Sequence, residues 1–131
     1  MARNRETIVY LDTHVVVWLY AGLLDKITDA AKKAIDESDL LVSQMVRLEL
    51  QYLFEIGRIK VRPDAIIDSL SKTIGLKISD FAFNQIIEEA LNLKWTRDVF
   101  DRLLVAEAKT LKRGFVSADR LVQSNFEQTI W

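Results

Sequence analysis

With 131 residues, half of them hydrophobic and 28% charged, the chain has the balance of one folded domain rather than of a disordered protein. Its net charge of −1 argues against a protein that binds nucleic acid through a broad basic surface, and the absence of cysteine excludes disulfides and thiolate metal sites. No apolar run reaches the roughly 18 residues of a membrane span, and the start MARNRETIVYLD lacks the apolar core of a signal peptide, so we expect a cytoplasmic protein.

The first half of the chain alternates strand-like runs with helical patterns. IVYLD (8–12) is typical of a buried strand that ends in a carboxylate, and an apolar helix is predicted from His14 to about Ala21. A second helix is expected over 28–38 with Thr28 as its N-cap. A short strand at 40–43 and a helix from Gln44 to about Ile56 complete this half.

The second half continues the alternation. Pro63 suits the first turn of a helix that runs to about Thr73. The expected elements that follow are a strand at 75–79, a helix over 81–91, a helix from Asp98 to Arg113 ended by Gly114, the strand FVSAD (115–119), and an edge strand in the tail QTIW.

This order predicts an α/β fold in one domain, residues 1–131. Strands separated by helices favour right-handed crossovers and a central, mostly parallel sheet of four to five strands flanked by helices. Ligands of such sheets bind beyond the carboxyl ends of the strands. Asp12 and Asp119 each close a predicted strand, so we expect them on the same rim of the sheet.

Glu49 occupies an unexpected side of the predicted helix 44–56. The polar stripe of that helix consists of Gln44, Arg47, Gln51, Glu55 and then Arg58. At roughly 100° per residue, Glu49 points about 160° away from the centre of that stripe, toward apolar neighbours. An acid there costs several kcal/mol unless it is paired or binds a metal. Glu49 is therefore either bridged to an arginine such as Arg102 or Arg120, or functional.

Two further acids stand three residues apart in the predicted helix 98–113. Asp98 shares a stripe with the basic residues Arg102, Lys109, Lys112 and Arg113, which indicates a solvated N-cap. Asp101 borders the apolar face of Leu104, Val105 and Ala108. It is either an acid stabilised by the positive end of the helix or a functional carboxylate.

Together, Asp12, Glu49, Asp101 and Asp119 make a candidate cluster of four carboxylates with no cysteine and no ligand histidine. Such a group repels itself and raises its own pKa values. A hard divalent cation removes this penalty, and ligation by oxygen alone selects Mg²⁺ or Mn²⁺ over Zn²⁺. One or two such ions can activate a water and stabilise the leaving oxygen in phosphodiester hydrolysis.

Three stretches of the sequence, in order, resemble the PIN-domain nucleases, and more closely the VapC-like toxins of bacterial toxin–antitoxin pairs. YLDTHVVVWLYAG resembles the branch motif LLDTHxxLW, and VSQMVRLELQYLFEIGRIKV resembles its S-x-x-S-x-W-E block that ends in G-R. RDVFDRLLVAEAKTLKRGFVSADR resembles RDPFDRLLIAQA…LVTAD, and TIW matches the usual last strand. The resemblance spans nearly the whole chain and implies a single PIN-like nuclease domain.

Carried over residue by residue, the acidic metal site of the family falls on the same four acids, Asp12, Glu49, Asp101 and Asp119. Ser117 matches a Ser/Thr position expected to orient the last acid or a metal-bound water. Two positions depart from the branch: Arg47 replaces a Trp and Val99 replaces a Pro. His14 belongs to the branch motif, where it is either a helix-start residue packed against the sheet or a catalytic base.

The resemblance implies a Mg²⁺-dependent endoribonuclease, with Mn²⁺ able to substitute, that cleaves single-stranded or looped RNA. It also implies a toxin that forms a homodimer and binds a small antitoxin. Arg58, Lys60 and Arg62 either hold RNA phosphates or form a solvated loop. The apolar residues Trp18, Leu19, Leu23 and Leu24 either belong to the core or face a dimer or antitoxin partner.

Other classes fail at named positions or remain open. A phosphoreceiver module needs an acidic pair after the first strand and a Lys after the last core strand, but Asp12 is followed by Thr13 and FVSAD leads to no Lys. A haloacid-dehalogenase phosphatase needs an Asp where this chain has His14. A housekeeping PIN-domain nuclease remains an alternative, as does a non-catalytic interaction domain whose acids are salt-bridged.

Overall fold

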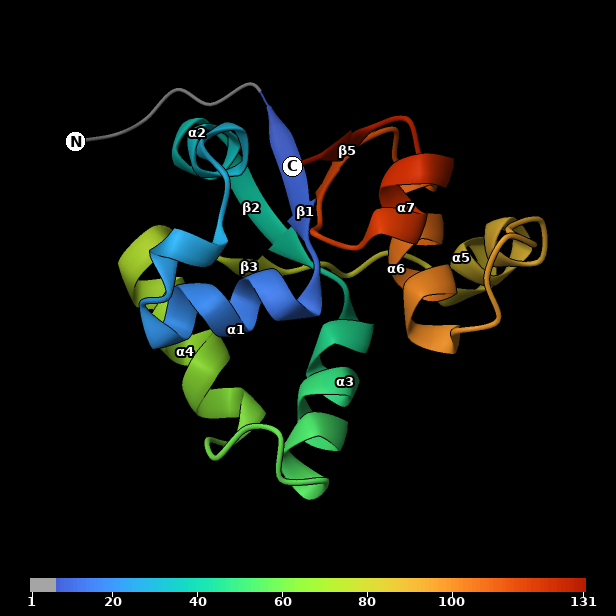
Figure 1. Ribbon diagram of the computed structural model, residues 1–131. Helices are drawn as coiled ribbons and strands as arrows, with labels where there is room; N and C mark the ends of the chain where they lie inside the picture. The colour runs from blue at the N-terminus through green and yellow to red at the C-terminus, as the bar shows by residue number, and fades with distance from the viewer. Residues whose placement is uncertain (1–6) are drawn as a thin grey trace.

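The computed structural model describes residues 7–131 and contains a sheet of five parallel strands flanked by helices (Figure 1). The elements, in chain order, are β1 (Ile8–Leu11), α1 (Thr13–Ala21), the 3₁₀ turn η1 (Leu24–Lys26), α2 (Asp29–Glu37), β2 (Asp39–Val42), α3 (Gln44–Glu55), α4 (Pro63–Ile74), β3 (Lys77–Ile78), α5 (Phe83–Ala90), α6 (Val99–Thr110), β4 (Gly114–Val116), α7 (Arg120–Asn125) and β5 (Thr129–Ile130). The predicted α/β class and the predicted parallel sheet are therefore confirmed. None of the helices in this part of the chain is long and apolar enough to cross a bilayer.

The order of the strands creates a crevice at the centre of the sheet. The order is β3-β2-β1-β4-β5, so the chain first builds from β1 toward one edge and then adds β4 and β5 on the other side. The change of direction falls between β1 and β4, where a parallel sheet opens a ligand crevice at its carboxyl end. The backbone N–H of Asp12 donates to the carbonyl oxygen of Val116 over 3.0 Å at this point.

The strand β1 lies in the middle of the hydrophobic core. Val9, Tyr10 and Leu11 are each at most 1% exposed, because β1 is covered by β2 and β4 at its edges and by helices on its faces. In Figure 1, β1 and β2 point toward the same end of the molecule, where α1 and α3 begin. The chain therefore leaves the core and starts two helices at one rim.

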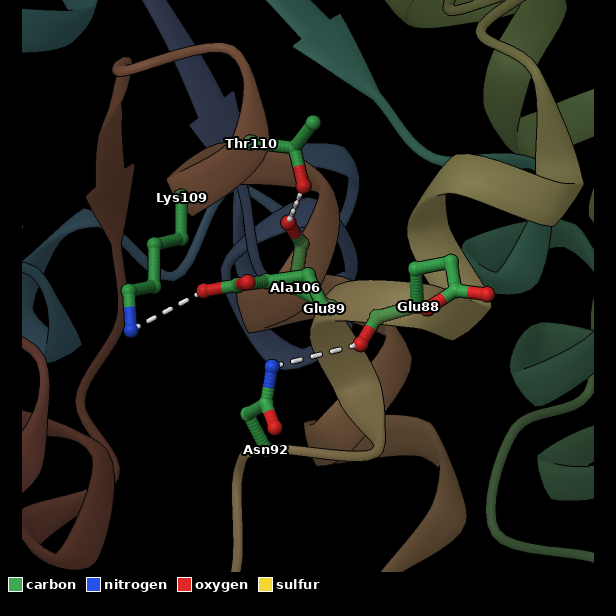
Figure 2. Close-up of polar contacts among 6 residues, drawn as sticks. All are labelled: Glu88, Glu89, Asn92, Ala106, Lys109 and Thr110. Carbon is green, nitrogen blue, oxygen red and sulfur yellow. Dashed lines mark hydrogen bonds and ion pairs between the residues drawn. The ribbon is translucent and has the colours of Figure 1, made fainter.

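The helix α6 is anchored against α5. Lys109 Nζ on α6 lies 2.9 Å from Glu89 Oε1 on α5, as Figure 2 shows. Arg102 of α6 adds a second link, because its guanidinium donates to the carbonyl oxygen of Ala90 over 2.9 Å. Figure 2 also shows the Thr110 hydroxyl donating to the carbonyl oxygen of Ala106, which holds the last turn of α6. These contacts fix the orientation of the helix that carries Asp101.

Four details of the predicted elements are wrong. Gly114 does not end the helix, because it is the first residue of β4 and α6 already stops at Thr110. Lys112 makes the turn instead, with a left-handed φ of 55°, while a Cβ on Gly114 would meet Ile130 Cδ1 at 2.9 Å. The predicted strand 115–119 ends at Val116, and the sequence pattern predicted neither α7 nor η1. The predicted strand 75–79 shortens to Lys77–Ile78 at the sheet edge.

Candidate active site

Three of the acids at the rim serve as helix N-caps. Asp12 follows β1 directly and accepts a 2.7 Å hydrogen bond from the backbone N–H of Thr13 at the start of α1. Asp98 accepts from the N–H of Asp101 over 3.0 Å, and Asp119 accepts from the N–H of Val122 over 3.0 Å. The backbone of each is extended, as N-caps require. The helices α1, α6 and α7 thus each begin at a carboxylate.

A cavity of about 280 Å³ lies at the N-termini of these three helices. It is lined by Asp12, His14, Trp18, Glu49, Asp98, Asp101, Ala118 and Asp119. The structure therefore brings together all four acids that the sequence predicted as the site. The prediction that Asp98 is a solvated N-cap is confirmed, because Asp98 is exposed and caps α6, and the structure shows in addition that it lines the cavity.

Ser117 lies behind this cavity and links its two sides. Its side chain is fully buried, and its hydroxyl donates to Asp12 Oδ2 over 2.6 Å. The same hydroxyl oxygen accepts from the backbone N–H of Asp119 over 3.1 Å. Burial raises the pKa of Asp12, whereas the hydrogen bonds from Ser117 and Thr13 lower it. The Ser117 hydroxyl therefore orients both acids: it bonds to the carboxylate of Asp12 and to the backbone N–H of Asp119.

Thr13 plays the matching role for Glu49, and the sequence analysis missed it. Thr13 is fully buried, and its hydroxyl donates to Glu49 Oε1 over 2.5 Å. Burial raises the pKa of Glu49, and the bond from Thr13 opposes that rise. Within residues 7–131 Glu49 forms no ion pair, and Arg102 donates to Ala90 instead. The alternative in which Glu49 forms a salt bridge to Arg102 or Arg120 is thus not observed among residues 7–131.

Asp101 has the strongest electrostatic signature in the cavity. Burial and, to a smaller extent, the negative charges of the other four acids (Asp98, Asp12, Asp119 and Glu49) together raise its pKa to about 7. Asp101 also sits in the first turn of α6, where the helix dipole favours an anion. Burial and repulsion outweigh that effect, so Asp101 is not merely an acid stabilised by its helix.

The donor set of the cavity fits a hard divalent cation in its chemistry. Every candidate ligand atom is a carboxylate oxygen, and Asp12, Glu49 and Asp101 all have raised pKa values that a nearby cation would lower. As they stand, however, no three acidic or histidine side chains in residues 7–131 converge closely enough to hold a metal ion. The carboxylates share one cavity without meeting at one point.

The three basic residues predicted to contact RNA are not part of this cavity. Arg58, Lys60 and Arg62 are exposed in the segment between α3 and α4. Arg62 instead lines a second cavity of about 370 Å³ together with Arg47, whose guanidinium donates to Gln44 Oε1 over 3.0 Å. Arg47 thus lies on the far face of α3 from Glu49, and an RNA-binding role for the three basic residues stays a prediction.

The sequence model of the PIN domain family matches residues 9–125. No curated protein is similar enough in sequence to match the chain.

Two solved structures share the fold. A chain of VapBC2 from Rickettsia felis, crystallised with a DNA fragment from their promoter, superposes with a TM-score of 0.65 at 16% identity, covering 95% of this chain and 100% of that one. A chain of VapBC-1 from nontypeable Haemophilus influenzae superposes with a TM-score of 0.53 at 15% identity, covering 93% and 92%. At these identities the likeness shows the fold alone.

Proposed function

Because the chain belongs to the PIN domain family, whose members are generally nucleases, we propose that it is a metal-dependent endoribonuclease and the toxin of a type II toxin–antitoxin pair. The observation that carries the proposal is the cavity at the β1/β4 crevice, which collects Asp12, Glu49, Asp101 and Asp119 from four separate segments. Burial of acids this close together raises the pKa values of Asp12, Glu49 and Asp101 and serves no evident packing purpose. It is the arrangement expected of a site for a divalent cation and a phosphodiester.

In this proposal Asp12, Glu49, Asp101 and Asp119 would hold Mg²⁺ or Mn²⁺ in the cavity that they line. Such a cation would supply Lewis acidity toward a phosphate and would lower the pKa of a water. Ser117 keeps the Asp12 carboxylate fixed through its 2.6 Å hydrogen bond, and Thr13 does the same for Glu49 through its 2.5 Å bond. Both hydroxyls are buried, so their positions do not depend on solvent.

The substrate in this proposal is single-stranded or looped RNA. The cavity is small and the net charge is −1, which favours contact with a few phosphates over broad electrostatic binding of a duplex. The likeness in fold to two VapBC structures supports the toxin assignment and, with it, a small antitoxin partner. A homodimer and action in the cytoplasm are further parts of the proposal. The proposed nuclease domain extends over residues 1–131.

The test is cleavage of labelled single-stranded RNA by the purified protein. We expect cleavage with Mg²⁺ or Mn²⁺, none in EDTA, and recovery when Mn²⁺ is added back. Products with 3′-hydroxyl and 5′-phosphate ends would support attack by water. Full activity in EDTA, or a cyclic 2′,3′-phosphate product, would overturn the metal mechanism. The Asp12→Asn variant, purified in parallel, controls for a contaminating nuclease because it should be inactive.

A further inference from the structure

The helix α1 begins inside the candidate active site and carries an exposed histidine at its mouth. Asp12 caps this helix, Thr13 binds Glu49, and the next residue, His14, lines the cavity while remaining exposed. His14 lines the same cavity as Asp12 and Glu49, which places the imidazole beside these two carboxylates. Neither the carboxylate cluster nor the packing of the sheet accounts for an exposed ring at this point.

His14 rests on a group of aromatic rings that holds it in position. Its ring centroid lies 6.2 Å from that of Trp18, four residues later on the same face of α1, with 49° between the planes. Trp18 is partly buried and contacts Trp131, with 6.0 Å between the ring centroids. Lys26 Nζ lies 5.8 Å from the Trp18 ring centroid. Trp18 is thus supported by two neighbours and in turn supports His14.

We propose that His14, supported by Trp18, stacks on an unpaired nucleobase of an RNA strand whose phosphodiester lies at the acidic cavity. Flat side chains beside a phosphate site bind single-stranded RNA by stacking on its splayed bases, and they accept any base because every base has a π-face. His14 is in this sense a positioning residue, and Trp18 acts through it. The inference rests on the proposed ribonuclease function and explains a preference for single-stranded over duplex RNA.

A binding experiment tests stacking directly. The chain has three tryptophans, and Trp95 lines a separate cavity with Lys109 and Lys112. The Trp95→Phe change therefore leaves Trp18 and Trp131 as the fluorescent reporters near the site. In that background, with Asp101→Asn to prevent cleavage, a single-stranded oligouridylate should quench the fluorescence. An abasic ribose-phosphate oligomer of the same length should quench little and bind about tenfold more weakly. Equal binding and equal quenching by the two oligomers would overturn the proposal.

A kinetic experiment separates stacking from a purely structural role. His14→Ala should raise KM for RNA about tenfold with little change in kcat, and His14→Phe should restore KM because it restores a ring. Tyr20→Ala is the matched control, since Tyr20 is an exposed ring of the same helix (37% exposed) that does not line the cavity. Its KM should not change.

The two levels of proposal fail in different ways. If wild-type protein cleaves RNA in a metal-dependent way but His14→Ala has an unchanged KM, the stacking proposal is overturned and the nuclease proposal stands. If wild-type protein neither binds nor cleaves RNA, both are overturned. If His14→Ala and His14→Phe lose activity equally while their thermal unfolding matches wild type, the ring is not what matters and stacking is again overturned.

Discussion

Ser117 and Asp12 are 105 positions apart in the chain, yet the Ser117 hydroxyl donates to Asp12 Oδ2 over 2.6 Å. Asp12 follows β1 and Ser117 follows β4, so this bond links the carboxyl ends of the two neighbouring strands. It lies at the point where the order of strand addition changes direction. Both side chains are buried, and the Ser117 oxygen also accepts from the N–H of Asp119. One hydroxyl therefore fixes the relative positions of the first and last acids of the site.

We predict that Ser117→Ala lowers both stability and cleavage. The variant removes a buried hydrogen bond that lowers the pKa of Asp12, so that pKa should rise further and the free energy of unfolding should fall by about 1–2 kcal/mol. Urea unfolding measures the stability change. Ser124→Ala is the control, because its hydroxyl bonds only to the backbone of its own exposed helix. Equal effects of the two variants would contradict the role given to Ser117.

A second prediction concerns the pH dependence of stability without metal. The pKa of Asp101 rises from 3.8 to about 7 on folding, and the pKa values of Asp12 and Glu49 also rise. Between the unfolded and folded pKa values, the folded state binds more protons than the unfolded state, so these groups make stability fall as pH rises. In EDTA we expect Tm to decrease from about pH 4 to about pH 7 through these acids.

The comparison with Asp101→Asn isolates this effect from other titrating groups. The variant cannot titrate at position 101, so its Tm in EDTA should fall less steeply with pH than that of wild type. Mg²⁺ should raise the wild-type Tm more at pH 8 than at pH 5, because the cation relieves repulsion among ionised acids. Parallel Tm curves for wild type and variant would mean that Asp101 titrates as an ordinary exposed acid.

The alternation of strands and helices could be predicted from sequence because it depends on local patterns. β1 is a continuous apolar run, and Thr28 and Pro63 mark helix starts by their own chemistry. The end of α6 could not be predicted in this way. Glycine usually ends helices, but Gly114 is needed inside the sheet, where Ile130 leaves no room for a Cβ. Only tertiary packing reveals that requirement.

The gathering of these acids in one cavity was predictable to a similar degree. Helix phase marked Glu49 and Asp101, and the end of β1 marked Asp12. Asp119 was marked by the end of a predicted strand, although that strand stops at Val116 and Asp119 instead caps α7. Thr13 gave only the weak signal of a hydroxyl beside Asp12, because its bond to Glu49 spans 36 residues. The ring contact between Trp18 and Trp131 was equally hidden, because it depends on where α1 meets the end of the sheet.

A third prediction tests Thr13. Thr13→Val keeps the shape of the side chain but removes the donor to Glu49, so the pKa of Glu49 should rise and its carboxylate should lose its fixed position. We expect cleavage to fall about tenfold, corresponding to one lost hydrogen bond of ~1.4 kcal/mol. Thr13→Ser keeps the hydroxyl and should retain most activity. Initial cleavage rates measure both, and equal losses would instead indicate a packing defect.

A fourth prediction concerns the toxin assignment. Expression of the chain should arrest the growth of a bacterial host, and co-expression of a small protein encoded next to it should relieve the arrest. The Asp119→Asn variant should be harmless at the same expression level, because it loses one acid of the site while Asn preserves the N-cap of α7. Harmless expression of a folded protein that cleaves RNA would favour a housekeeping nuclease over a toxin.

The last prediction separates Asp101 from Asp98, which line the same cavity three residues apart. Asp101 is the partly buried acid whose pKa rises to about 7, whereas Asp98 is exposed and caps α6 by accepting from the N–H of Asp101. Asp101→Asn should therefore reduce cleavage by orders of magnitude while folding persists, and its stability in EDTA should rise because one repelling charge is gone. Asp98→Asn should keep most activity, since Asn caps a helix about as well as Asp, and it should lower the pKa of Asp101 by removing a neighbouring charge. Cleavage rates measure activity, and circular dichroism shows whether each variant is folded. If Asp98→Asn is folded but inactive while Asp101→Asn is active, Asp98 and not Asp101 is the acid that cleavage requires.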